Sequence, residues 1–284
     1  MDSSPELSEA PPDMLVVEQP PAAVVASTDI GRKRQDNEDS FLIFDLGART
    51  LHPEQVQVDC QLDPPGLLLA VADGMGGHQS GQVASQICIE TLTAEFLRCL
   101  SLSETDQEVE WEQELTNAVE TANQQVSTLA RDNPEHQGMG TTLTAALITV
   151  TKVVVAHVGD SRAYLLRDGE LRQLTRDQTV GNSLQQMHQD FKADSRFADM
   201  LVQAVGTAER LDVELTTTPL EGGDCLLICC DGLYKVVEAS AIAEVVGSAG
   251  PLGDRVRELI VRANSAGGPD NITVVLAELR KKAV

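Results

Sequence analysis

The chain has few basic and few aromatic residues, and these shortages weigh against a surface that binds nucleic acid. Its 284 residues include 21 Lys and Arg against 44 Asp and Glu, so the formal net charge is −23, and aromatic residues make up 3%. Binding to phosphate backbones or anionic membranes requires clustered Lys and Arg. We therefore expect no nucleic-acid partner and no membrane partner. The excess of carboxylates suits a soluble protein that tolerates divalent cations.

Long apolar runs and a basic N-terminal segment are missing as well. No apolar stretch approaches the roughly 18 residues that a membrane-spanning helix needs. The first basic residue is Arg32, so the charged segment that opens a secretory signal is absent, and we expect a cytoplasmic protein. The six cysteines lack paired metal-ligand spacing, and a disulfide framework is not expected in such a chain. We interpret Cys229 and Cys230 as free thiols inside a strand.

Composition divides the chain into a short tail and one large domain. Residues 1–23 contain several prolines and acids but no basic residue, which predicts a disordered tail. The remaining length is ample for a sizeable core, and we expect one domain over residues 24–284.

Apolar periodicity assigns secondary structure to this domain. Amphipathic spacing predicts helices over 80–100, 108–131 and 254–264. Short β-branched runs predict strands over 24–28, 41–44, 67–72, 141–150, 153–158, 162–166, 213–218, 225–230 and 272–279. The pair Asp168-Gly169 is typical of a hairpin turn. Strand groups separated by helices indicate α+β layers rather than strict βαβ alternation.

Four predicted strands have an aspartate at one end, with glycine nearby. Asp73, Asp160 and Asp231 follow apolar runs, and Asp270 precedes the last run. If these strands are neighbours, their ends gather several carboxylates, which repel one another unless a cation neutralises them. The pattern predicts a metal site with hard oxygen ligands, which suits Mg²⁺ or Mn²⁺ better than zinc or copper.

Several other motifs are excluded by single residues. The segment 73–78 is not a dinucleotide fingerprint, because Gln79 stands where the third glycine belongs, and no P-loop lysine follows. Ser161 lacks the closing glycine of a nucleophile elbow. No clustered calcium loop of the EF-hand kind is present. Arg34, in contrast, is of the residue type preferred for binding phosphate, because a planar guanidinium can donate two parallel hydrogen bonds to one phosphate group.

Taken in chain order, the motifs resemble the metal-dependent protein serine/threonine phosphatases of type 2C, bacterial branch. The resemblance covers about residues 24–280, and the matching segments are 34–39, 73–78, 138–142, 159–162, 230–232 and 268–273. It implies a four-layer αββα sandwich, in which helix pairs flank two antiparallel sheets and the metals lie at one end. It also implies hydrolysis of phosphoserine and phosphothreonine on proteins, which counteracts Ser/Thr kinases. The sequence is silent on oligomeric state, and a monomer is the simpler expectation.

The resemblance further implies roles for individual residues. Two Mn²⁺ or Mg²⁺ ions share Asp73 and hold a bridging hydroxide that attacks phosphorus directly. The other implied metal ligands are Glu38, Asp39 and the carbonyl of Gly74 at one ion, Asp231 and Asp270 at the second, and Asp160 with Asp231 at a weaker third. Arg34 binds the phosphate, and His78 is a candidate proton donor to the leaving oxygen.

The segment at about 178–205 departs from the family pattern. It is polar and has only a weak helical pattern, and in the family this region is a mobile flap beside the site. Loops beside a site often set specificity, so substrate choice stays open. Two alternatives also stay open: a partner-switching phosphatase, which usually carries a sensor domain, and a pseudophosphatase that only binds phosphoproteins. The intact set of aspartates favours an enzyme.

Overall fold

The computed structural model describes residues 21–52, 57–76, 79–103, 109–187 and 195–281. Most of the predicted tail and the candidate proton donor His78 lie outside these ranges. The first strand, β1 (Pro21–Asp29), begins at Pro21 rather than at residue 24. Its early residues are held on both sides, because Ala22 pairs with Leu279 on one neighbouring strand and with Cys60 on the other.

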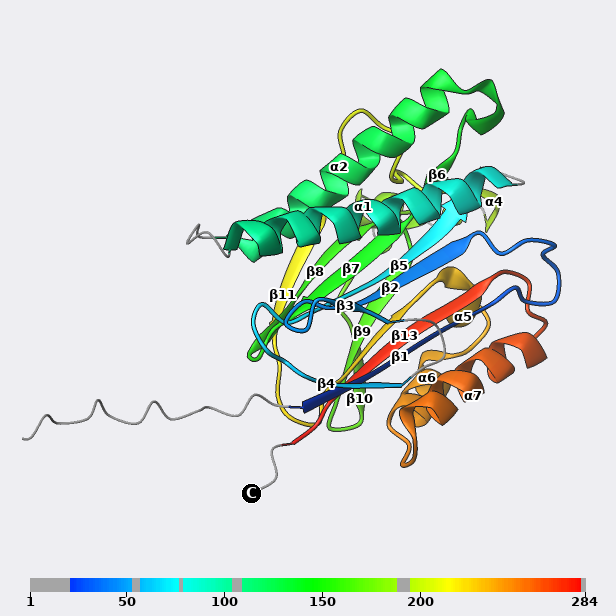
Figure 1. Cartoon of the computed structure of the whole chain (residues 1–284). Helices are drawn as coiled ribbons and strands as arrows, with labels where there is room; N and C mark the ends of the chain where they lie inside the picture. The colour runs from blue at the N-terminus through cyan, green and yellow to red at the C-terminus, as the bar shows by residue number, and fades with distance from the viewer. Residues whose placement is uncertain (1–20, 53–56, 77–78, 104–108, 188–194, 282–284) are drawn as a thin grey trace, which may run out of the picture.

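Within these residues the strands form two antiparallel sheets, as predicted. The first sheet contains, in spatial order, β10 (Glu170–Gln173), β9 (Arg162–Arg167), β12 (Cys225–Cys229), β13 (Ile272–Leu279), β1 and β4 (Val58–Gln61). The second contains β11 (Glu214–Pro219), β8 (Lys152–Val158), β7 (Leu143–Ile148), β5 (Leu67–Met75), β2 (Asp39–Asp45) and β3 (Thr50–Leu51), with β6 (Gly140–Thr141) paired to β5. The sheets stack face to face, and helices cover their outer faces (Figure 1).

Three apolar layers hold this sandwich together. The helices α1 (Gln79–Ser103) and α2 (Trp111–Asp132) pack on the second sheet, and the η1 turn (Pro134–His136) follows them. The helices α5 (Asp231–Tyr234), α6 (Ala239–Val246) and α7 (Leu252–Ser265) cover the first sheet. Aliphatic side chains such as Leu69 and Ile228 fill the space between the sheets. The predicted αββα architecture is confirmed, and among the described helices none combines the length and apolarity needed to cross a bilayer.

Local sequence explains most of these elements. In α2 the residues Leu115, Ala118, Val119, Ala122 and Val126 recur at helical spacing and are buried. The predicted hairpin turn joins β9 to β10, and both its residues adopt positive φ, as a tight turn of this kind requires.

Helix α6 is an element that the sequence analysis missed. Its buried residues are Ile242, Val245 and Val246, which lie close together in a short, largely apolar segment. Eight residues give about two helical turns, too few for a periodic pattern to stand out from that of a strand.

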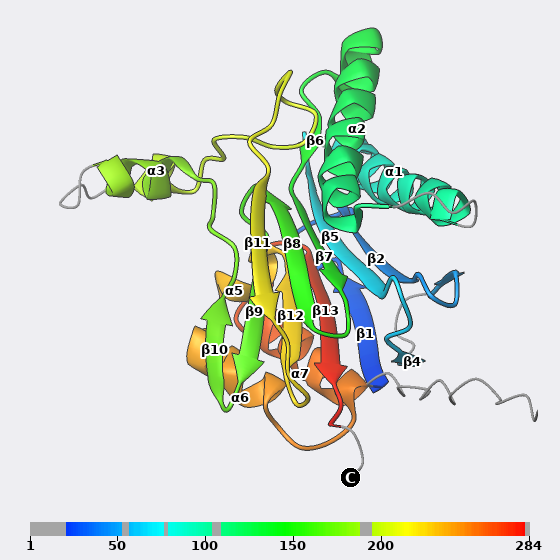
Figure 2. The ribbon, with the colours of Figure 1, turned by 90° about the vertical axis from the view of Figure 1, so that its left-hand side faces the viewer.

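The predicted flap is an excursion with a fixed base. The segment follows β10 of the first sheet, forms α3 (Val180–Met187) and α4 (Ser195–Ala198) after Gln178, and returns at Val202 on the way to β11 of the second sheet. Backbone hydrogen bonds close its base, from the Val202 N–H to the Gln178 carbonyl and from the Val180 N–H to the Met200 carbonyl, both 2.8 Å. Figure 2 shows α3 standing away from the sandwich.

A buried histidine in β8 makes the stability of the fold depend on pH. The ring of His157 is 1% exposed, and its Nδ1 lies 2.9 Å from the Thr144 hydroxyl. Burial lowers the pKa of His157 from 6.5 to about 4. At this residue the unfolded chain takes up a proton between these two values while the folded chain does not, so the contribution of His157 to stability falls as the pH decreases through this window.

We predict that His157→Gln flattens this part of the stability profile. The wild-type histidine should cost up to about 3 kcal/mol on acidification from pH 7 to pH 4, and glutamine cannot be protonated there. Urea unfolding of both proteins at several pH values would measure the difference. An equal loss of stability in the two proteins over this window would contradict the assignment.

Candidate active site

Four aspartates at strand ends lie together at one end of the sandwich. In the second sheet, Asp73 lies near the end of β5 and Asp160 follows β8. In the first sheet, Asp231 follows β12 and Asp270 precedes β13. They surround a cavity of about 260 Å³ lined by Arg34, Glu38, Asp73, Gly74, Met75, Gly76, Thr142, Asp160, Asp199, Leu201, Asp231, Lys235 and Asp270. The two sheets thus bring together the candidate ligands.

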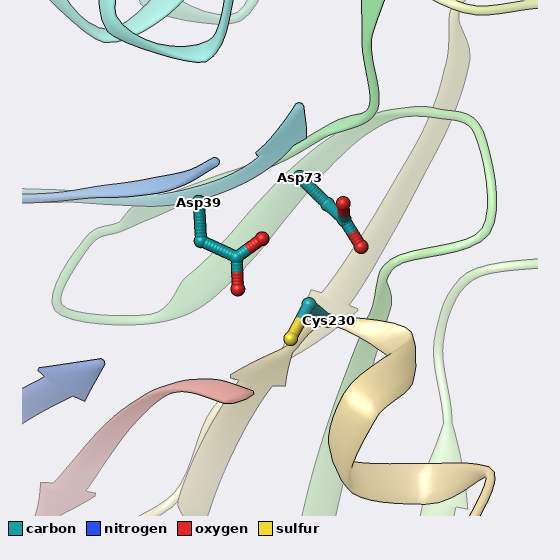
Figure 3. A group of neighbouring side chains, drawn as sticks. All are labelled: Asp39, Asp73 and Cys230. Atoms are coloured by element: carbon teal, nitrogen blue, oxygen red, sulfur yellow. The ribbon is translucent and has the colours of Figure 1, made fainter. Parts of the chain in front are cut away.

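The deepest part of this site is a pair of aspartates on neighbouring strands. Asp39 and Asp73 lie directly opposite each other in the β2–β5 ladder. One carboxylate oxygen of each, together with the Cys230 Sγ, lies within 4.8 Å of the others. Figure 3 shows the three side chains, two extending from adjacent strands and the third from the residue after β12. The register of one strand pair therefore determines the spacing of the two carboxylates.

Burial and mutual repulsion disfavour the charged forms of these carboxylates. Burial, together with Asp231 and Asp270, raises the pKa of Asp39 to about 7. Burial and the neighbouring aspartates, Asp39 first, raise the pKa of Asp73 well above its usual value. Burial and Asp231 raise the pKa of Asp160 to about 6. It is therefore unfavourable for all of these carboxylates to be ionised at once, and a cation bound among them would offset their burial and repulsion.

Three carboxylate oxygens in this cluster are buried and have no hydrogen-bond partner among the described residues. They are Glu38 Oε1, Asp39 Oδ1 and Asp231 Oδ1. A buried acceptor without a partner is costly, and native proteins rarely leave several at one place. Buried carboxylate oxygens without a partner, on three segments that meet at this end of the sandwich, are the kind of donor that a divalent cation requires.

Cys230 is a neighbour of this cluster that the sequence analysis described only as a strand thiol. Burial, and then the charges of Asp39 and Asp73, raises its pKa well above the usual value. The thiol also has partners: its sulfur accepts the Thr273 N–H at 3.0 Å and donates to the Asn271 carbonyl at 3.3 Å. The thiol is thus occupied by two backbone partners, and the donors of the cluster that lack a partner among the described residues are carboxylate oxygens.

Arg34 lies at the rim of the cavity and reaches Asp270. Its Nη2 donates to Asp270 Oδ2 at 2.6 Å, while the other oxygen of that carboxylate accepts the Asn271 N–H at 2.8 Å. The Arg34 side chain is 48% exposed, so part of the guanidinium faces solvent. It can thus bind an anion that enters the cavity.

Gly74 is needed for close backbone packing beside the aspartates. A Cβ at this position would lie 2.2 Å from the carbonyl oxygen of Gly81 and 2.5 Å from that of Glu38. The Gly74 N–H also donates to the Glu38 carbonyl at 3.2 Å. The absence of a side chain thus lets the start of α1 and the Glu38 segment approach the end of β5.

Sequence reasoning assigned no role to the threonines that orient Asp39 and Asp73. The Thr273 hydroxyl donates to Asp39 Oδ2 at 2.6 Å, and the Thr142 hydroxyl accepts the Asp73 N–H at 3.1 Å. The Thr141 hydroxyl donates to the Asp73 carbonyl at 2.9 Å. All three lie within matching motif segments, which was the signal available, but only the fold shows which atoms they contact.

Asn271 joins the two motif segments that carry Glu38 and Asp270. Its Oδ1 accepts the Glu38 N–H at 2.9 Å, and its Nδ2 donates to the carbonyls of Ile30 and Asp36, both at 3.0 Å. The side chain is buried at the start of β13. One amide thus fixes the path of the loop that presents Glu38 and Asp39.

We predict that Asn271→Ala destabilises the fold by about 3 kcal/mol, because it leaves buried backbone groups without partners. Urea unfolding would measure the loss. The matched control is Asn117→Ala on α2, where the amide contacts only the side chains of its own helix, Gln113 and Glu114, and where the change should be below about 1 kcal/mol. Equal effects of the two substitutions would show that Asn271 does not hold the site loop.

Comparisons with known proteins agree with this geometry. Residues 50–270 match the family model described as protein phosphatase 2C. The serine/threonine phosphatase stp of Listeria welshimeri is 34% identical over 254 residues, covering 88% of this chain and 93% of that protein.

Two solved structures show the same likeness in three dimensions. A serine/threonine phosphatase of S. agalactiae superposes with a TM-score of 0.77 at 31% identity, covering 91% of this chain and all of the other. The catalytic domain of the serine/threonine protein phosphatase PstP, in complex with two manganese ions, gives a TM-score of 0.72 at 32% identity, covering 92% of this chain and all of the other. The chain therefore belongs to the protein phosphatase 2C family.

Proposed function

We propose that this carboxylate cluster holds two divalent cations and that the cavity above it binds the phosphoryl group of a phosphoserine or phosphothreonine. The chain is a serine/threonine protein phosphatase by family, and its relatives are bacterial phosphatases of this class. The observation that carries the proposal is a group of buried carboxylate oxygens, without hydrogen-bond partners in the described part of the chain, beside a cavity lined by Arg34.

The donor set fits Mn²⁺ or Mg²⁺. The proposed ligands are Glu38, Asp39, Asp73, the Gly74 carbonyl, Asp231 and Asp270, all of which offer oxygen. Among the described residues, the thiol beside these ligands is Cys230, whose pKa is raised and whose sulfur has backbone partners. The related PstP structure with two manganese ions supports the number of cations and favours manganese as the first ion to test.

When bound, two such cations supply positive charge and a water of lowered pKa. The residues of this chain bind and orient the phosphoryl group and position the carboxylates. Arg34 donates to the phosphoryl oxygens and thereby orients the phosphorus towards the carboxylate cluster. Asp39 and Asp73, positioned by their ladder register and by threonine hydroxyls, keep the charge beneath the phosphoryl group fixed. His78 stays a candidate for the proton that the leaving seryl or threonyl oxygen takes up.

The hydroxyl groups of the cavity do not favour a phosphoseryl or phosphothreonyl enzyme, which supports direct attack by water. Among the described residues that line it, Thr142 bears the one side-chain hydroxyl. That hydroxyl is buried, accepts the Asp73 N–H and lies 2.7 Å from the Ser161 hydroxyl. It is therefore occupied by structural hydrogen bonds, and it is not available as a nucleophile.

The biological setting follows from this chemistry. The substrates are phosphoserine and phosphothreonine proteins, and the reaction opposes a cognate Ser/Thr kinase in cytoplasmic signalling. We propose a monomer as the simplest arrangement, since the carboxylates and Arg34 that line the cavity all come from one chain.

We predict metal-dependent release of phosphate from a phosphothreonine peptide. Wild-type protein freed of metal should be inactive and should recover activity with Mn²⁺. Asp73→Asn should lower kcat at least about a hundredfold in Mn²⁺, because its carboxylate charge is lost. Without metal this variant should be as stable as wild type or more so, because repulsion within the cluster decreases.

The control is Asp254→Asn, which alters an exposed aspartate paired with Arg257 on α7 and should keep full activity. Phosphate release and thermal unfolding measure both effects. Folded wild-type protein that binds Mn²⁺ yet releases no phosphate would point to a pseudophosphatase.

We predict that Arg34→Ala lowers kcat/KM by about tenfold to a hundredfold, because a charge-assisted hydrogen bond to the phosphoryl group is lost. The affinity for Mn²⁺ should not fall, since the substitution removes a positive charge beside Asp270. Steady-state kinetics and Mn²⁺ titration separate the two effects, and Arg257→Ala on the exposed face of α7 is the control. A loss of Mn²⁺ binding that explains the whole kinetic defect would contradict a phosphate-binding role.

A further inference from the structure

Lys235 lies between two carboxylates that the family resemblance assigns to a third cation. Its Nζ is 2.6 Å from Asp231 Oδ2 and 3.5 Å from Asp160 Oδ2. Both carboxylates are largely buried, with exposed side-chain fractions of 17% and 8%. A lysine ammonium is positively charged at neutral pH, so the pair of anions already has a cation between them.

The backbone holds this lysine in place. Asp231 begins the single turn of α5, and the Lys235 N–H donates to the Asp231 carbonyl at 3.1 Å. This i,i+4 spacing directs the lysine side chain back over the aspartate of its own turn. The position of the ammonium group is thus a consequence of local sequence.

Neighbouring residues fix the same turn against the second sheet. The Tyr234 hydroxyl donates to the Asp160 carbonyl at 2.9 Å. The Arg162 guanidinium lies over the Tyr234 ring, 3.6 Å from its centroid, and donates two hydrogen bonds to Asp177 at 2.8 and 2.6 Å. The distance between Asp160 and α5 is therefore fixed, and the space between the two carboxylates is already filled by the ammonium group.

The two oxygens of Asp231 have different surroundings. Oδ2 accepts from Lys235, whereas Oδ1 is buried and has no partner among the described residues. One oxygen is thus available to the proposed pair of cations, and the other is occupied by a side chain of the protein. The carboxylate can serve both without changing its orientation.

Lys235 also lies between two neighbouring cavities of the surface. It lines the cavity of the proposed active site and a neighbouring cavity of about 460 Å³, which lies beside Arg162, Asp177 and α3. A divalent ion in this position would need ligand oxygens from both carboxylates, and it would have to displace a cation that is already hydrogen-bonded.

From this arrangement we propose that the Lys235 ammonium group replaces the third divalent cation of the site. The chain then binds two metal ions rather than three, and the charge beside the phosphoryl cavity is permanent instead of depending on metal concentration. This inference rests on the proposed two-cation site. It assigns Lys235 as a positioning residue for Asp231 and Asp160 rather than as a ligand.

The test counts Mn²⁺ ions bound per chain by equilibrium dialysis in millimolar Mn²⁺, with metal analysis of the protein. Wild type should bind two ions. Lys235→Asp should bind three, because it removes the resident cation and adds a carboxylate. Adding Asp160→Asn to that variant should return the count to two. Lys152→Gln, which breaks the pair with Glu112 at the far end of β8, is the control and should bind two.

Each outcome separates this inference from the proposed function. Three ions on the wild type would overturn the role of Lys235 and leave the phosphatase proposal standing, whereas no ions on the folded wild type would remove the proposed function itself. Two ions on folded Lys235→Asp would also overturn the inference. If that variant does not fold, Lys235→Gln decides: beyond the two resident ions it should bind a third Mn²⁺ at least about tenfold more tightly than wild type does, and an unchanged titration would contradict the proposal.

Discussion

Repulsion among buried carboxylates is the interaction on which the rest of this structure depends. Asp39, Asp73 and Asp160 all have raised pKa values, with burial as the main cause and neighbouring aspartates as the next. The fold keeps these groups together although each disfavours the charge of the others. It can do so because the strands that carry them are paired over many residues and packed in a large apolar core. The stability of that core offsets the repulsion between the carboxylates.

The sandwich holds the repelling carboxylates at fixed positions, which gives the site a defined geometry. Ladder register sets the separation of Asp39 and Asp73, and the second sheet meets the first where Asp231 and Asp270 project. The Thr273 hydroxyl then holds the Asp39 carboxylate, while Thr141, Thr142 and Asn271 fix the backbone of Asp73 and Glu38. A cation entering such a site meets ligands that are already oriented, and little reorganisation is required.

Sequence reasoning predicted the α+β elements from short-range patterns, and the four-layer sandwich from the family resemblance. The carboxylate cluster was expected on the condition that the strands ending in aspartate are neighbours. Apolar runs, helical spacing in α2 and the Asp168-Gly169 turn are local signals, and the structure confirms the elements that they predict. Helix α6 was missed because two turns are too short for a period to be recognised. The partners of Asn271 and of Lys235 also escaped prediction. Asn271 is 233 residues away from Glu38, and no spacing rule could show that contact before the sheets were assembled.

The closed base of the α3–α4 excursion has a consequence for how this protein can change. Since the backbone pairs at residues 178–180 and 200–202 anchor both ends, the part between them can lengthen, shorten or change sequence without moving the strands that carry the aspartates. Each doubling of such a loop adds only about 0.6 kcal/mol of closure entropy. Asp199 and Leu201 lie beside the anchored end and line the cavity, so variation further out reaches the mouth of the site but not its floor. A lineage could therefore acquire new substrates by remodelling one surface segment while the catalytic chemistry stays the same.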